Sequence, residues 1–128
     1  MTARTSTPAV LSEEMLMQIF EPPITFHRCL VPVTGSVTAA LMLSQAIRDS
    51  ETLDPQSGGW FSKSQEQWTE DTGLSRWEQE TARRVLRQAG LIEEHRVGMP
   101  ARLWFRVCEG PVFEALQQQA ERTAGQRR

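Results

Sequence analysis

The stretch Glu70-Asp71-Thr72-Gly73-Leu74-Ser75 lies between two short helical patterns and decides how the chain is expected to fold. Gly73 can take the left-handed backbone conformation that often ends a helix. Leu74 can anchor the turn in a core, and Ser75 can cap the helix that follows. The stretch therefore predicts two helices joined by a tight turn.

Both helices of this pair begin with the same capping signal. Ser64 is followed three residues later by Gln67, and Ser75 is followed three residues later by Glu78. In such a capping box, the hydroxyl of the first residue and the side chain of the fourth each satisfy a free backbone N–H. We expect the second helix to run to Ala89.

Further elements are expected on either side of the helix pair. Ser36 caps a helix over residues 37–49 that is apolar nearly all round, which predicts a central core helix or a dimer contact. Residues 60–61 form a small strand. Residues 91–96 and 101–107 alternate as two strands around a short turn, so they predict a β-hairpin.

Helices are also expected near both ends of the chain. Ser12 caps a helix that stops at Pro22-Pro23, and a last helix runs from about Pro111 to Glu121. Residues 24–34 are expected to be an extended connector, in which Pro32 argues against a central strand.

The length of 128 residues fits one domain. Tails at 1–10 and 122–128 are expected to be disordered, which leaves a single domain over 11–121 with its core at 34–107. No run of about 18 apolar residues is present, so no membrane span is expected.

The two cysteines indicate in which cellular compartment the protein is expected. Cys29 and Cys108 are far apart in the sequence, and no secretory signal is recognisable at the start of the chain. We expect both to be reduced, buried thiols in a cytoplasmic protein.

These elements follow one another in the order of a winged helix-turn-helix. We expect an α+β fold, mainly helical, with the C-terminal β-hairpin as the wing and extra N- and C-terminal helices. In this class the second helix of the pair lies in the major groove of DNA, and the wing can contact the backbone or the minor groove.

The distribution of charge agrees with this expectation. The net charge is −2, which by itself argues against strong nonspecific nucleic-acid binding. Residues 1–74 carry 4 basic and 9 acidic side chains, whereas residues 75–107 carry 7 basic and 4 acidic ones. The positive charge is thus concentrated in the second helix and the hairpin.

One face of the second helix is expected to contact bases. At about 100° per residue, Arg76, Arg83 and Arg87 share an arc that points away from the apolar side, with Gln79 beside it. We expect Arg76, Gln79 and Arg83 to contact base edges. Glu80 lies in the same stripe, where it could accept a bond from cytosine or hold an arginine in place. A solvated helix face is the alternative.

A second set of residues is expected to contact phosphates through basic side chains or hydroxyls. Its members are Lys63, Ser64, Ser75, Arg84, Arg87, Arg96, Arg102 and Arg106. On the second hairpin strand, Phe105 should face the core while Trp104 and Arg106 face outward, and Arg106 is explained equally well as a solvated side chain. Trp77 is expected to pack against the loop at Trp60, with contact to DNA or a partner as alternatives.

Signatures of enzymes are missing from the sequence. There is no phosphate-binding loop, no Gly-x-Ser-x-Gly motif and no His/Cys set at metal-ligand spacing. We therefore expect no catalytic activity, no metal and no cofactor.

Several stretches resemble winged-helix proteins carried by phages, plasmids and integrative elements. They are residues 34–45 (TGSVTAALMLSQ), 59–64 (GWFSKS), 72–76 (TGLSR), 78–83 (EQETAR) and 98–106 (GMPARLWFR). The resemblance covers about two-thirds of the chain. It implies the fold of the N-terminal modules of replication-organiser and plasmid replication proteins, and it implies DNA binding.

The chain also departs from these relatives. Residues 47–48 are Ile-Arg where the relatives usually carry aromatic residues, and only one short helix follows the wing. This favours a small regulator or accessory protein over a replication initiator.

The function expected from the sequence is sequence-specific binding to double-stranded DNA by a homodimer, in transcription regulation or DNA replication of a mobile element. The alternative is a protein–protein interaction module within a nucleoprotein complex, without DNA binding of its own. The acidic first half of the chain would suit that alternative.

Overall fold

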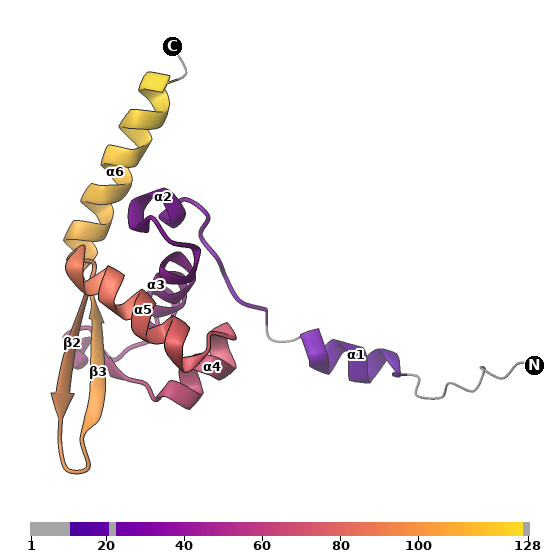
Figure 1. Cartoon of the computed structure of the whole chain (residues 1–128). Helices are drawn as coiled ribbons and strands as arrows, with labels where there is room; N and C mark the ends of the chain where they lie inside the picture. The colour runs from indigo at the N-terminus through magenta and orange to yellow at the C-terminus, as the bar shows by residue number, and fades with distance from the viewer. Residues whose placement is uncertain (1–10, 21–22, 127–128) are drawn as a thin grey trace, which may run out of the picture.

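The computed structural model describes residues 11–20 and 23–126. The fold is α+β and mainly helical, as expected (Figure 1). The elements in chain order are α1 (Glu13–Phe20), α2 (Leu30–Thr34), α3 (Val37–Ser50), a 3-10 turn η2 (Pro55–Ser57), β1 (Trp60–Ser62), α4 (Gln65–Thr72), α5 (Arg76–Gln88), β2 (Ile92–Val97), β3 (Arg102–Val107) and α6 (Glu109–Gln126). This order is compatible with the expected winged helix-turn-helix.

The sheet has three antiparallel strands in the order β1-β3-β2. Phe105 at the centre of β3 lies opposite Phe61 of β1 and opposite Glu94 of β2. The short β1 therefore extends the hairpin on one side, and β2 is left as the edge strand on the other.

Helix α3 lies at the centre of the core. Ala39, Ala40, Met42, Leu43 and Ala46 are fully buried, so this helix is covered on more than one side, as its apolar sequence predicts. It packs against α5, α2 and the sheet. The alternative that α3 forms a dimer contact is not needed to explain its apolar surface.

Capping explains where the central helices begin. The Oγ atoms of Ser36, Ser64 and Ser75 each accept a bond from the backbone N–H three residues later, at 3.1–3.2 Å. Both predicted capping boxes are complete. Gly73 ends α4 with a φ of 77°, which confirms the predicted left-handed turn.

Helix α1 stands apart from the rest of the chain in Figure 1. Ser12 caps it as expected, because Met15 N–H donates to the Ser12 Oγ at 3.1 Å. Residues 11–18 are all exposed. No helix in the described parts of the chain is both long and apolar enough to cross a membrane.

Three expectations about the flanking segments are wrong. Part of the connector 24–34 forms α2, because Pro32 falls in the first helical turn, where no N–H is required of it. Residues 122–126, expected to be a disordered tail, continue α6, which extends to Gln126; arginine, alanine and glutamine favour a helix here, and the hydroxyl of Thr123 donates to the carbonyl of Gln119 one turn earlier. Cys29 is exposed and Cys108 is half-buried, rather than both being buried. The expected tail at 1–10 lies outside the described residues.

Candidate nucleic-acid interface

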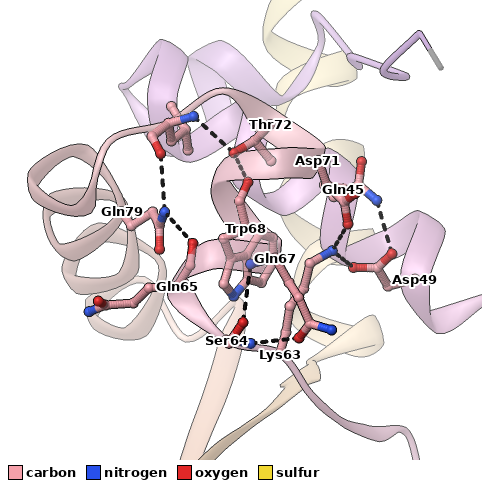
Figure 2. A network of polar contacts seen from close by, with 11 residues as sticks. Gln45, Asp49, Lys63, Ser64, Gln65, Gln67, Trp68, Asp71, Thr72 and Gln79 are labelled. Atoms are coloured by element: carbon pink, nitrogen blue, oxygen red, sulfur yellow. Dashed lines mark hydrogen bonds and ion pairs between the residues drawn. The ribbon is translucent and has the colours of Figure 1, made fainter. Parts of the chain in front are cut away.

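The side chain of Gln79 holds the turn between α4 and α5 together. It is 1% exposed, and its Nε2 donates to the carbonyl of Gln65 at 3.1 Å (Figure 2). The same Nε2 donates to the hydroxyl of Thr69 at 3.0 Å and to the carbonyl of Leu74 at 3.1 Å. This placement contradicts the expectation that Gln79 lies on the outer face beside the arginines. A wheel drawn from the helix alone cannot show it, because the partners of Gln79 lie on α4 and in the turn.

Arg83 of α5 is bound to Glu94 of the wing strand β2. Its Nε and Nη2 donate to the two carboxylate oxygens at 2.8 and 2.7 Å, and Arg87 donates to the same carboxylate at 3.0 Å. The side chains of Arg83 and Glu94 are only 15% and 8% exposed. Arg83 therefore faces the hairpin rather than solvent, contrary to the expected stripe of three outward arginines.

The electrostatics of this cluster favour its charged form. Burial tends to raise the pKa of Glu94, but the hydrogen bonds and charges of Arg83 and Arg87 outweigh it and lower that pKa. The hydrogen bond to Glu94 raises the pKa of Arg83. The cluster therefore acts as an ionised link between the helix and the wing.

Lys63 is buried and joins α3 to α4. Its Nζ lies 2.6 Å from a carboxylate oxygen of Asp49, forms a second ion pair with Asp71 and lies 4.6 Å from the centroid of a Trp68 ring (Figure 2). The expectation that Lys63 holds a phosphate does not fit this position, since two carboxylates already neutralise its charge. These ion pairs could not be inferred from the sequence, because Asp49 and Asp71 are 14 and 8 positions away from Lys63 and lie on other elements.

Arg106 belongs to the opposite side of the hairpin. Its Nη2 lies 2.9 Å from both carboxylate oxygens of Glu93, and its guanidinium lies 4.8 Å from the Trp60 ring centroid. The hydrogen bond from Arg106 lowers the pKa of Glu93.

The two serines of the predicted phosphate-contacting set lie at the starts of helices. The hydroxyls of Ser64 and Ser75 cap α4 and α5.

The remaining arginines of the predicted set are exposed. The side chain of Arg76 is 75% exposed, and its Nε lies 3.6 Å from Oε1 of Glu80. Arg84, Arg96 and Arg102 are exposed, and none has a carboxylate at ion-pair distance within residues 11–20 and 23–126. These four supply the cationic surface of α5 and the wing.

Trp77 lies on the outer surface of α5. It is 71% exposed, so the expected packing against the loop at Trp60 is wrong. The buried side of α5 comprises Gln79, Ala82 and Leu86, which turns the position of Trp77 outward.

A groove of about 640 Å³ lies between the wing and the helix pair. It is lined by the start of α4, the inner side of α5 and the facing parts of β2 and β3. Four of its lining residues are basic, namely Lys63, Arg83, Arg96 and Arg102, and none of its lining residues is acidic. Lys63 and Arg83 are paired with carboxylates, so the positive charge that the groove can offer to an anion comes from Arg96 and Arg102.

In the described parts of the chain, no group of three or more His, Cys, Asp or Glu side chains is arranged to hold a metal. Comparison of the chain with models of protein families, with curated proteins and with solved structures gave no match. The resemblance to winged-helix proteins of mobile elements thus stays a prediction.

Proposed function

We propose that this chain is a winged helix-turn-helix protein that binds double-stranded DNA in a sequence-specific manner. Helices α4 and α5 are the helix pair, and the β2–β3 hairpin is the wing. The observation that carries the proposal is the groove between them, in which Arg96 and Arg102 have no carboxylate at ion-pair distance among the described residues and no lining residue is acidic. A polyanion is the ligand class that such a surface attracts.

Arg96 and Arg102 are the phosphate contacts of this proposal. Both line the groove, and both lack a carboxylate partner among the described residues. Lys63 and Arg83 line the same groove, but their charges are balanced by aspartates and by Glu94. The two wing arginines therefore provide the charge that phosphates can pair with.

In this proposal, residues on the outer face of α5 contact the bases. Arg76 stands at its first residue and Arg84 two turns further on, both exposed. The N-terminal residues of the second helix in a helix-turn-helix contact base edges, and a guanidinium suits guanine. Glu80 orients Arg76 from 3.6 Å. Gln79, Arg83 and Lys63 act indirectly, by fixing how α5 is held.

A regulator or replication accessory protein of a mobile element is the biological role that we propose, acting as a homodimer. A two-fold symmetric dimer contacts two half-sites of opposite orientation. The proposal thus includes a near-palindromic target sequence.

Selection from random-sequence duplex DNA at two salt concentrations tests the proposal. We expect an enriched motif that is nearly palindromic, retained less well at the higher salt concentration. If no motif is enriched and retention does not depend on salt, the proposal is overturned.

A variant pair identifies the phosphate-contacting surface. Arg102→Ala should weaken binding to all sequences alike and reduce the slope of log affinity against log salt by about one. Arg122→Ala is the matched control, because Arg122 is an exposed arginine on α6. This control should leave both quantities unchanged.

A protein-interaction module within a nucleoprotein complex is the second candidate, and α1 favours it. Met15, Leu16 and Met17 are 49%, 39% and 59% exposed on this helix. Exposed apolar helices commonly bind the groove of a protein partner. Salt-sensitive binding to a protein, with no binding to duplex DNA, would favour this second candidate over the first.

A further inference from the structure

Trp77 is the one tryptophan among the described residues whose ring is left mainly to solvent. It is 71% exposed, whereas Trp68 is 1% exposed and packs against Phe61 and Phe105. Trp60 lies against His95 and beneath the guanidinium of Arg106. No aromatic or cation contact of this kind holds Trp77 within the described parts of the chain. Packing within the fold therefore does not explain why an indole stands at this position.

The position of Trp77 on α5 points to its ligand. It is the second residue of the helix, directly after Arg76, and Arg84 follows seven residues later on the same outer side. On this outer side the exposed Arg76 and Arg84 outnumber Glu80, which lies beside Arg76, so the charge around the indole is net positive. A basic protein surface would be repelled here, and a polyanion would be attracted.

The base edges in the major groove carry one apolar group, the C5-methyl of thymine. Arginine cannot recognise that group, whereas a flat apolar ring can cover it and exclude water from it. The two neighbouring side chains would thus recognise different groups: the guanidinium of Arg76 donates to acceptor atoms on a base edge, and the indole contacts a methyl group.

We propose that Trp77 is a specificity-determining residue that packs its indole against thymine methyl groups in the major groove. This inference rests on the proposed DNA-binding function. It adds a preferred base and a direction of contact, since the thymines lie next to the base pair that Arg76 reaches.

The test uses the full chain and the duplex enriched by selection, prepared with thymine or with uracil at every thymine position. Uracil lacks only the methyl group. We expect each contacted methyl group that is removed to weaken binding of the wild type by about fourfold, the value of burying one methyl group. Trp77→Ala should weaken binding to the thymine duplex and respond little to uracil, and Trp77→Phe should retain part of the preference.

Two controls separate this contact from a change in the fold. Val37→Ala removes another exposed apolar side chain, 62% exposed on α3, and should leave the affinity unchanged. Tryptophan emission should also become less accessible to acrylamide when the thymine duplex is added to the wild type. This protection should be largely lost in Trp77→Phe, whose remaining tryptophans are more buried.

The outcomes distinguish the inference from the function on which it rests. If Trp77→Ala binds the thymine duplex as tightly as the wild type, and uracil has no effect on either, the inference is overturned while DNA binding stands. If neither protein binds any duplex at low salt, the proposed function itself fails.

Discussion

Arg83 of α5 donates two hydrogen bonds to the carboxylate of Glu94 in β2, at 2.8 and 2.7 Å. The second helix of the pair is therefore attached to the wing through side chains as well as through the short connection between them. In the proposed complex this link sets the angle at which α5 and the wing meet the duplex.

Glu94→Gln should lower the free energy of unfolding by about 2–3 kcal/mol, because it leaves the shielded guanidinium of Arg83 without its counter-charge. Urea unfolding at neutral pH measures the change. Glu93→Gln is the matched control on the neighbouring position, where the pair with Arg106 is much more exposed, and it should destabilise the protein far less than Glu94→Gln does. Equal losses in the two variants would contradict a special role for Glu94.

Glu94 should also contribute to the acid sensitivity of the fold. Burial raises its pKa, but the hydrogen bonds and charges of Arg83 and Arg87 lower it by more, so the pKa in the folded state is below the ordinary value. Its stabilising contribution is therefore present above the unfolded pKa of about 4.3 and is lost as the pH falls through the folded pKa. The free energy of unfolding should thus fall less steeply in Glu94→Gln than in the wild type below about pH 5. Parallel pH profiles would refute this.

Gln79→Met should destabilise the protein by about 2 kcal/mol, because it removes the donor shared by Gln65, Thr69 and Leu74 while keeping the side-chain volume. Gln88→Met, at an exposed position of the same helix, should change stability by less than about 0.5 kcal/mol. Thermal unfolding of both variants checks the difference. Comparable melting temperatures for the two would show that the buried amide is dispensable.

Lys63→Met should lower the free energy of unfolding by about 1–2 kcal/mol, with allowance for water around the half-exposed Asp71. The reason is that Asp49 and Asp71 lose the cation between them. The salt dependence of DNA binding should nevertheless keep its slope, unlike that of Arg102→Ala, because Lys63 is already neutralised. A slope reduced by about one in Lys63→Met would instead assign it a phosphate.

Local signals in the sequence predict most of the fold. The three serine caps and the left-handed Gly73 depend on residues within four positions of one another, so they can be recognised without tertiary information. The alternation that buries Phe105 is local in the same way. The helix pair and the hairpin could therefore be placed with nearly correct boundaries.

The candidate site was harder to predict, for one physical reason. Polar side chains were expected to face water, yet Gln79, Arg83 and Lys63 are shielded because their partners come from other elements. These partners, such as Glu94 and Asp49, cannot be assigned from spacing along one helix. Conversely, the apolar Trp77 was expected to pack inward and lies outside.

The position of β2 at the edge of the sheet bears on aggregation. On its outer side, its backbone N–H and C=O groups have no neighbouring strand in the described parts of the chain. Such unpaired groups at a sheet edge can pair with a strand of another molecule. Four consecutive residues of this strand, Glu93, Glu94, His95 and Arg96, are polar or charged. A strand from another copy would have to bring its own side chains against these groups, so the sheets of crowded copies are kept from merging into a continuous fibre.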